Sequence, residues 1–504
     1  YHLGECYLKT NQKVFARNSF GYSAKFNFDT ELHEDALFNQ AMLAYELSYH
    51  PYYEAIDAFR QYLRDYQSGY RNTTIQSYLV SVFLTTKNYK EAISTIEEIK
   101  NKTKEMEYAY QKVCYYRGIE LYNALSFTAA IQHFDKALSN PLDKNINALS
   151  LYWKGEALYQ LKRYDEAADN FKKFLFEPGA INFNEFYTAN YNLGYCFYKK
   201  KDYPTAISWF RKYTTLNPTN DNARITDALL RIADCYYITK DYENAKDYYL
   251  LASQKGEISS DYGLYQYALT LGLTGKNEEK INTLNKLINN YPESNFADDA
   301  RFEMAQTYQK IGQNDNAISN FKQFIKDYPN SNLIRKAWVL QGLSYYNMEQ
   351  DEEALKIYKK VVNEFPNTEE AYEALNGIKN IYVESGRGDE YASFVQGVSY
   401  ANVSNAALDS TTYQAAENLY IKGNCNEAKK LFDKYLKNYP EGIFKLNANY
   451  YKADCHYKDK EFDKALENYA TVLVFPASPL TEKALVNTSR IHYSNKNYAE
   501  AKEA

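Results

Sequence analysis

The sequence contains no apolar run of about 18 or more residues, the length that a helix needs to cross a bilayer. It also lacks an excess of positive charge, because 59 lysine and arginine residues face 64 aspartate and glutamate residues, giving a net charge of −5. Binding to a phosphate backbone requires a basic stripe that this composition does not supply. We therefore expect no transmembrane segment in this sequence and no nucleic-acid partner.

Motifs for catalysis or metal binding are missing as well. The stretch 272–276 has the wrong spacing for a phosphate-binding loop, and the pair His33-Glu34 is followed by Leu37 where a zinc protease needs its second histidine. Cys455 and His456 are adjacent, so a helix would point their side chains about 100° apart. The other histidines are scattered. We expect a protein that is not an enzyme, with no catalytic residue, no bound metal and no cofactor.

What the sequence does contain is a repeat with a period of about 37 residues. In most repeats an alanine, the anchor, is followed four positions later by an aromatic or aliphatic residue, as in Ala167 and Phe171. A small residue, such as Gly155, lies twelve positions before the anchor; we number it slot eight of the repeat. Anchors with a visible partner are Ala16, Ala55, Ala92, Ala130, Ala167, Ala206, Ala245, Ala317, Ala354, Ala428 and Ala465.

Each repeat has the pattern of helix, short turn, helix and longer turn. In the repeat that starts at Ser331, Gly342 and Tyr345 recur at helical spacing, and so do Ala354 and Tyr358. A period of this length is typical of solenoids, in which each repeat buries its apolar face against the next. We predict an all-α fold, an α-solenoid superhelix of about 14 helix-turn-helix repeats. We expect residues 1–504 to form one continuous array and to be a fragment that is cut inside a repeat at both ends.

Two joints depart from this pattern, at 253–262 and at 386–411. Lys280 and Tyr391 replace the anchor alanine in the repeats concerned. A large residue where two helices approach closely is expected to loosen the local packing. These joints are therefore either hinges, or places where the repeats repack and the rod stays continuous.

The six cysteines were compared by their repeat positions, since a bridge requires two close backbones. The slot two residues after the small one holds Cys6, Cys196, Cys235 and Cys455. Equivalent helices in a stack lie at least about 8–10 Å apart, beyond the Cα separation of about 7 Å that a disulfide allows. Cys114 and Cys425 have no obvious partner. We expect buried free thiols, which favours a reducing compartment, although a periplasmic protein can also carry them.

The repeat resembles the tetratricopeptide repeat over essentially the whole chain, as Gly155, Leu158, Tyr164, Ala167 and Phe171 illustrate. The usual period of that family is about 34 residues. The extra residues fall in a Tyr-Pro-x-Ser joint, which resembles the envelope branch of the family. That branch includes the lipoprotein of the outer-membrane β-barrel assembly machine, the periplasmic partner of the Tol–Pal system, and large repeat proteins of Bacteroidetes envelopes. The resemblance implies a periplasmic scaffold associated with the outer membrane.

The resemblance also implies a concave groove, lined by the first helix of each repeat, that binds peptides. Chaperone-binding members hold a terminal carboxylate with a lysine at slot five and an asparagine at slot nine. Here slot five holds no lysine and slot nine is often acidic, so that clamp is absent. Tyrosines recur instead at slots five and twelve, two helical turns apart on one face. The candidate groove residues are Tyr115, Tyr122, Tyr152, Glu156, Tyr159, Tyr191, Tyr198, Asp234, Tyr237, Tyr413, Tyr420, Tyr450, Asp454 and Tyr457.

These tyrosines either bind a partner segment of some basic character or pack within the repeats. Our first hypothesis is a non-enzymatic scaffold that binds a protein or peptide segment as part of a bacterial envelope complex. The alternative is a cytoplasmic adaptor or regulator, which unpaired cysteines favour. A glycan-handling enzyme or binder is a third class, disfavoured because no carboxylate pair stands out.

Overall fold

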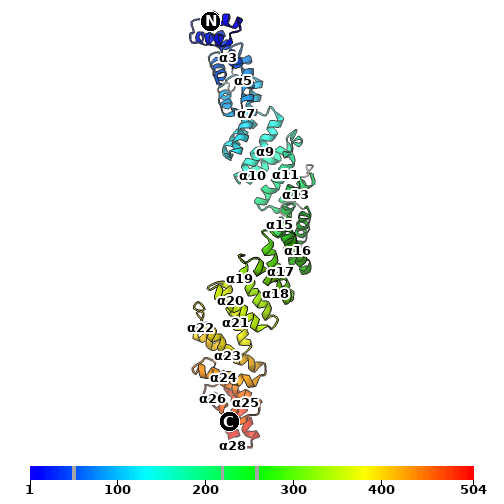
Figure 1. Ribbon diagram of the computed structural model, residues 1–504, viewed down its shortest axis with the longest axis vertical. Coiled ribbons are helices and arrows are strands. Elements are labelled where there is room, and N and C mark those ends of the chain that lie inside the picture. Colours follow the sequence, from blue (N-terminus) through cyan, green and yellow to red (C-terminus); the bar gives the residue numbers. More distant parts are fainter. Residues whose placement is uncertain (48–52, 217–220, 256–259) are drawn as a thin grey trace. The chain divides into compact units, whose positions relative to one another are not determined.

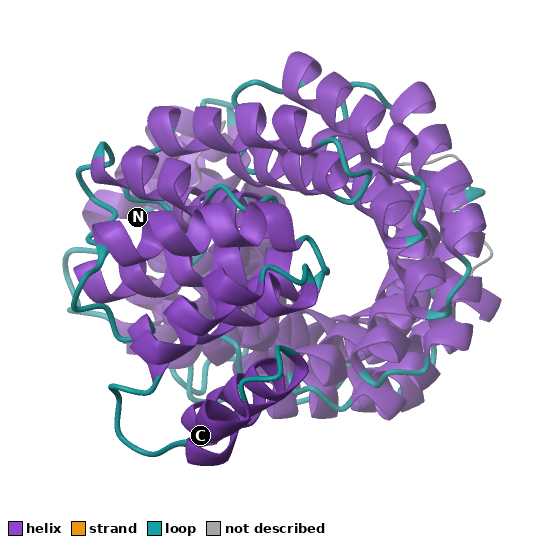
Figure 2. Ribbon diagram, turned by 90° about the horizontal axis from the view of Figure 1, so that it is seen from below, coloured by secondary structure: helices purple, strands orange, loops and turns teal. Residues whose placement is uncertain are grey.

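The computed structural model describes residues 1–47, 53–216, 221–255 and 260–504. Their secondary structure consists of α-helices, numbered to α28, and one short 3-10 helix, and none of these residues forms a strand (Figures 1 and 2). The chain divides into two compact segments, Tyr1–Gly263 and Leu264–Ala504. The predicted all-α repeat fold is confirmed.

Odd-numbered helices are the first helix of a repeat, helix A, and even-numbered helices are the second, helix B. The first segment contains α1 (His2–Lys9), α2 (Lys13–Ser23), α3 (Thr30–Leu47), α4 (Tyr53–Asp65), α5 (Asn72–Thr86), α6 (Tyr89–Glu98), α7 (Lys104–Asn123), α8 (Phe127–Leu138), α9 (Lys144–Gln160), α10 (Tyr164–Phe176), η1 (Ala180–Asn182), α11 (Glu185–Lys199), α12 (Tyr203–Leu216), α13 (Asn222–Ile238) and α14 (Tyr242–Ser253). The segment boundary falls within α15 (Ser260–Leu273). The second segment continues with α16 (Asn277–Asn290), α17 (Ala297–Lys310), α18 (Asn314–Asp327), α19 (Ile334–Tyr346), α20 (Asp351–Glu364), α21 (Glu369–Glu384), α22 (Gly388–Gln396), α23 (Asn405–Ile421), α24 (Cys425–Asn438), α25 (Lys445–Lys458), α26 (Phe462–Val472), α27 (Pro479–Ser494) and α28 (Tyr498–Glu503).

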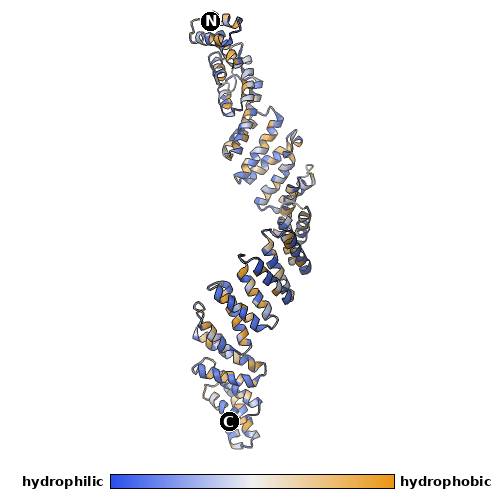
Figure 3. Cartoon of the chain, in the orientation of Figure 1, coloured by the Kyte–Doolittle hydropathy of each residue, from blue (hydrophilic) through white to orange (hydrophobic). Residues whose placement is uncertain are grey.

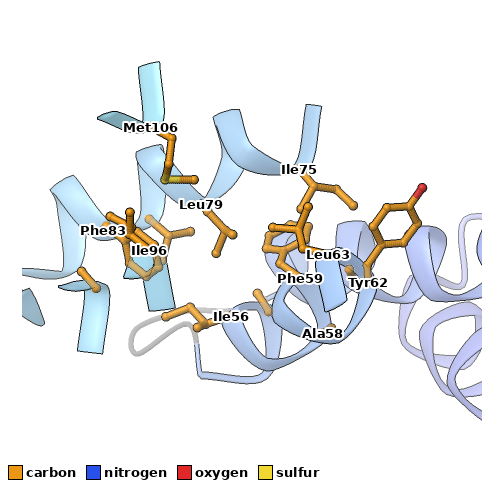
Figure 4. Close-up of a cluster of buried hydrophobic side chains, with 14 of the residues drawn as sticks. Ile56, Ala58, Phe59, Tyr62, Leu63, Ile75, Leu79, Phe83, Ile96 and Met106 are labelled. Carbon is orange, nitrogen blue, oxygen red and sulfur yellow. The ribbon is translucent and has the colours of Figure 1, made fainter. Parts of the chain in front are cut away.

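The alanine anchors and their partners form the core, as the repeat pattern predicts. Ala55 and Phe59 in α4 are both 0% exposed. Figure 4 shows Leu79 of α5 between Phe59 of α4 on one side and Ile96 of α6 on the other, with Met106 of α7 near Leu79, so one apolar layer is shared by helices of successive repeats. The core is therefore a series of such layers, because each repeat covers the apolar face of its neighbour.

Glycine at slot eight allows helix A to approach the aromatic ring of helix B. A Cβ placed on Gly194 would lie 2.5 Å from the ring of Phe210, and one on Gly342 would lie 2.6 Å from the ring of Tyr358. These distances are far below an ordinary carbon–carbon contact of about 3.5–4.0 Å. The small residue is therefore required by close packing in these repeats.

A residue in the left-handed backbone region ends helix A in almost every described repeat. In α9 this residue is Lys162, with φ of 60°, and the Arg163 N–H donates back to the Leu158 carbonyl at 2.9 Å. This closure satisfies carbonyls that the helix end leaves free. The equivalent residues are Asn11, Lys87, Leu125, Lys162, Lys201, Lys240, Gly275, Gly312, Glu349, Gly386, Gly423, Lys460 and Lys496.

Both large residues at the irregular joints are accommodated within the packing. Lys280 is 9% exposed, and its side chain lies against Gly272, whose slot holds tyrosine in many other repeats. The Lys280 ammonium then pairs with Glu303 at 2.6 Å. Tyr391 is 6% exposed. Residues 256–259 of the first joint lie outside the described residues, and bending at either joint stays a prediction.

The cysteine prediction is wrong for three of the six residues. Cys425 and Cys455 form a disulfide with a Cα separation of 5.2 Å. Cys425 begins helix B of one repeat and Cys455 lies in helix A of the next, whereas the sequence argument compared only equivalent helices. Cys6 is exposed because it lies on the first helix. Cys114, Cys196 and Cys235 are buried free thiols, as predicted.

Apolar residues are distributed in short patches along the helices. Figure 3 shows hydrophobic and hydrophilic residues interspersed along the helices. None of the described helices combines the length and the apolar character that a bilayer crossing requires.

Candidate functional site

The slot-five tyrosines lie mostly inside the repeats. Tyr152 of α9 is 7% exposed, and its ring centroid lies 5.6 Å from that of Phe171 and 5.3 Å from that of Phe174, both on helix B of the same repeat. The other slot-five rings are similar: Tyr115, Tyr413 and Tyr450 are buried and Tyr191 is half-buried. Of the two alternatives, packing within the repeat describes four of these five rings, because slot five lies at mid-helix and faces helix B.

The hydroxyl groups of these buried rings connect successive repeats. The Tyr152 hydroxyl lies 3.0 Å from the Thr188 hydroxyl, and the Tyr191 hydroxyl donates to Asp227 at 2.7 Å. Tyr195 donates to the same carboxylate at 2.5 Å. Burial raises the pKa of Tyr191, so this phenol remains a donor. Sequence reasoning missed Asp227, although it lies one repeat period after Tyr191.

The slot-twelve tyrosines are different, because each lies at the end of helix A, where helix B covers less of the ring. In most repeats the ring packs edge-on or tilted against an aromatic residue at the start of helix B, whereas Tyr420 packs against Tyr451 of the next helix A. The Tyr159 and Tyr164 centroids lie 5.4 Å apart, and those of Tyr198 and Tyr203 lie 6.1 Å apart. The same pairing joins Tyr122 to Phe127, Tyr237 to Tyr242, Tyr457 to Phe462 and Tyr493 to Tyr498.

These pairs fix the orientation of slot-twelve rings that remain partly open to solvent. Tyr122, Tyr159, Tyr198 and Tyr237 are half-buried. They lie on α7, α9, α11 and α13, which are consecutive A helices that touch one another. In the second segment, Tyr420 and Tyr457 are half-buried on α23 and α25, two A helices in contact. The structure thus places four candidate tyrosines in one row in the first segment and two in the second.

Two of the three candidate carboxylates already have cationic partners. Asp234 pairs with Arg231 and accepts a hydrogen bond from Tyr249 at 2.7 Å. Asp454 pairs with Lys458 at 2.8 Å. Their negative charge is therefore largely compensated within the protein.

Glu156 is the exception. It accepts a hydrogen bond from the Asn192 side chain and makes no ion pair among the described residues, although the positive charge of Arg224 is near enough to act on it. Burial raises the pKa of Glu156 because the charged form loses hydration. Its charge in turn contributes to raising the pKa of Tyr122. This partly buried carboxylate has no ion-pair partner and lies close to tyrosine rings, so it is chemically suited to a basic side chain.

The described residues were also compared with the requirements of a metal site. Across the residues that the structure describes, no group of three or more histidine, cysteine, aspartate or glutamate side chains is placed to hold a metal ion. His456, which neighbours Cys455 in sequence, is buried and bonds to Glu461 at 2.5 Å.

Comparison with known proteins gives two family matches. The sequence profile of the outer membrane lipoprotein (YfiO) family matches residues 144–306 and 258–381. A tetratricopeptide-repeat profile matches residues 413–479. No curated protein matches the chain in sequence.

Solved structures of repeat proteins are similar to parts of the chain. The C-terminal part of a TPR repeat-containing protein from Cytophaga hutchinsonii is 14% identical, covering 52% of this chain and 99% of its own, with a TM-score of 0.42. A tetratricopeptide-repeat protein from Parabacteroides merdae is 17% identical, covering 53% and 98%, with a TM-score of 0.33. YrrB, described as a TPR protein with an unusual peptide-binding site, is 20% identical, covering 42% and 95%, with a TM-score of 0.32.

The family matches agree with the helix pairs, the buried anchors and the period of the sequence. Repeats of this kind are protein–protein interaction scaffolds that expose an extended surface built from successive helices. The chain thus contains tetratricopeptide repeats at residues 413–479 and, at residues 144–381, a region similar to the outer membrane lipoprotein (YfiO) family.

Proposed function

We propose that this protein is a non-enzymatic scaffold of a bacterial envelope that binds a partner segment along its A helices. The observation that carries the proposal is the row of slot-twelve tyrosines on α7, α9, α11 and α13. Each ring is half-buried and held by contacts within its own repeat, most visibly the aromatic pairs at Tyr159 and Tyr198. Binding to rings that are already ordered costs little further entropy.

Near this row lies the one candidate carboxylate that makes no ion pair with another described residue. Burial raises the pKa of Tyr122 and Tyr159, and the charge of the nearby Glu156 adds to both shifts. A lysine or arginine from the partner would satisfy this carboxylate and would also pack against the neighbouring rings. The proposed ligand is therefore an extended or helical segment with a basic residue that reaches Glu156.

Two observations support an envelope location. One is the match of residues 144–306 and 258–381 to an outer membrane lipoprotein family. The other is the Cys425–Cys455 disulfide, since disulfides persist in oxidising compartments and are rare in the cytosol. The alternative, a cytoplasmic adaptor, requires both cysteines to be reduced. Thiol labelling of the native protein in intact cells separates the two: a disulfide supports the envelope, and free Cys425 and Cys455 support the adaptor.

Photocrosslinking tests the helix A surface directly. Benzoylphenylalanine replaces Tyr159 or Tyr198 in the proposed row, and Tyr70, which is 76% exposed elsewhere in the first segment, provides the control position. We expect a discrete protein adduct from positions 159 and 198 and none from position 70. We also expect Glu156→Gln to reduce that adduct, because the variant removes the charge and retains the shape.

A separate measurement distinguishes binding from packing. Tyr198→Ala should lower capture of the partner while changing the melting temperature little, whereas Tyr152→Ala should lower the melting temperature because its ring belongs to the core. Equal adducts at positions 70 and 198, or a Tyr198→Ala variant as unstable as Tyr152→Ala, would contradict the proposal.

A further inference from the structure

A pocket of about 360 Å³ lies between α4 and α6, the B helices of two consecutive repeats in the first segment. Its walls include Arg60, Leu63 and Arg64 from α4, Thr95 and Glu98 from α6, and Lys100 just beyond it. Leu63 belongs to the apolar layer in Figure 4, so the pocket borders the core. Because it is built from B helices, this pocket is separate from the tyrosine row on the A helices.

The charges of this pocket do not balance. Among the lining residues, Arg60, Arg64 and Lys100 face the single carboxylate of Glu98, an excess of two positive charges, although Asp65 lies beside Arg64 and the charges of Asp57 and Glu91 act on Arg60. One Nη of Arg60 lies 2.8 Å from both oxygens of Glu98, whose side chain is 62% exposed. Arg64 approaches only its neighbour Asp65, at 3.8 Å, and no carboxylate of the described residues pairs with Lys100. The exposed Glu98 carboxylate thus already pairs with Arg60 at the rim of the pocket. An anionic ligand would bind at this same position.

Thr95 provides a second and independent observation. Its side chain is 1% exposed, and its hydroxyl has no hydrogen-bond partner. Some buried threonines in other helices, such as Thr307 and Thr411, donate to the carbonyl four residues earlier, whereas Thr226 also lacks a partner. A buried hydroxyl without a partner is unfavourable and calls for an explanation. A ligand that accepts a hydrogen bond in the pocket would supply the missing partner.

We propose that this pocket binds the phosphate group of a small organic phosphate ester. A phosphate monoester carries about two negative charges, which matches the excess of the lining. Guanidinium groups bind phosphate through paired N–H donors, and the Thr95 hydroxyl adds another donor. The volume exceeds that of a bare ion and lies in the range of small-molecule sites, and Leu63 offers an apolar wall for the organic part.

The neighbouring repeat provides a matched control. A pocket of about 470 Å³ between α2 and α4 is lined by Arg17 and Lys25 but also by Glu54 and Asp57, so its charges cancel. Arg17 pairs with Glu54 at 2.9 Å. This second pocket has a similar size without the excess positive charge, and we expect it not to bind phosphate.

Calorimetric titration of the whole protein tests the site, with inorganic phosphate and glycerol 3-phosphate as soluble probes. We expect saturable binding of glycerol 3-phosphate. Thr95→Val should weaken it about tenfold, the value of one hydrogen bond to a charged group, without lowering the melting temperature. Glu98→Gln should strengthen binding several-fold, because it frees Arg60 and removes a negative charge. Glu54→Gln, in the control pocket, should leave binding unchanged.

The source of the phosphate group is tested with vesicles. Binding to phosphatidylcholine vesicles that contain phosphatidic acid, but not to phosphatidylcholine alone, would identify a lipid headgroup; preference for glycerol 3-phosphate would identify a soluble ester. Failure of both the wild type and Glu98→Gln to bind any of these probes would overturn the proposal. So would stronger binding of a glutamate-rich peptide than of glycerol 3-phosphate, or a Thr95→Val variant that is more stable and binds equally well. If Thr95→Val is more stable and binds equally well, the basic residues serve only to stabilise the C-terminal ends of α4 and α6 by interacting with the helix dipole.

Discussion

Gly194→Ala tests the close approach of the two helices within a repeat that carries candidate tyrosines. Gly194 lies in α11, and a Cβ at this position would be 2.5 Å from Cδ1 and 2.6 Å from Cε1 of Phe210. Phe210 is 0% exposed, and its ring centroid lies 5.3 Å from that of Tyr195 and 5.9 Å from that of Tyr191. The ring therefore has no free space into which it can move.

The expected cost follows from two opposing contributions. An ordinary carbon–carbon contact is about 3.5–4.0 Å, so the ring or helix must shift by about 1 Å, and overpacking of this kind costs about 1–3 kcal/mol. Alanine is a better helix former than glycine by about 0.5–1 kcal/mol, which offsets part of that cost. We expect Gly194→Ala to destabilise its repeat by about 1–2 kcal/mol.

Native-state hydrogen exchange is the suitable assay, because it reports on single repeats. The slowest amides of α11 and α12 should exchange about tenfold faster in Gly194→Ala. The matched control is Ala305→Gly in α17, where Ala305 already faces Phe321 and both are fully buried; it should lose only the helix-propensity contribution. Unchanged or slower exchange in Gly194→Ala would refute the close approach.

Three further predictions concern the core, the candidate site and the disulfide. Ala354→Leu should destabilise the second segment by about 1–3 kcal/mol in urea unfolding, because the fully buried anchor has no room for a larger side chain; a variant that unfolds like the parent would show the repeat register to be wrong. Burial raises the pKa of Glu156 above 4.5, so this group favours the folded state at low pH and that contribution is lost as pH rises through the folded pKa. Glu156→Gln should therefore match the wild type at about pH 4 and be more stable at pH 7 in paired thermal melts, and equal stability at both values would contradict the burial. Reduction of Cys425–Cys455, which are 30 residues apart, should destabilise α24 and α25 by about 3 kcal/mol, and exchange rates in these helices that do not respond to reductant would contradict this.

The sequence predicted the repeat and its packing elements well, because these depend on contacts between positions at a fixed spacing. Ala167 must be small where helices cross, and Phe171 lies one helical turn further on the same face, so both are buried. The proline of the Tyr-Pro-x-Ser joint follows from an equally local rule, because proline cannot continue a helix. By contrast, the residues that end helix A with positive φ are often lysines, such as Lys162 and Lys201, which carry no strong local signal for that conformation.

The candidate site was predicted in part. Slots five and twelve do share a direction on helix A, but depth differs along the helix. Tyr152 lies at mid-helix beneath helix B, while Tyr159 lies at the helix end beside a single ring of helix B. A helical pattern predicts the direction in which a side chain points from the helix axis. It does not predict how deeply the neighbouring helix buries that side chain at each position along the axis. The ion pair between Asp234 and Arg231 likewise depends on side-chain conformations that the sequence spacing does not specify.

The sequence by itself determined the all-α repeat architecture, the anchors and the absence of recognised catalytic motifs, because a periodic pattern records contacts between nearest neighbours. Only the tertiary structure decided which groups meet across repeats. The Cys425–Cys455 bridge, the Tyr191–Asp227 hydrogen bond and the charge excess around Arg60 all join residues of two successive repeats. The distances between these residues depend on how the helices of one repeat pack against the next repeat. The side chains of both repeats together determine this packing.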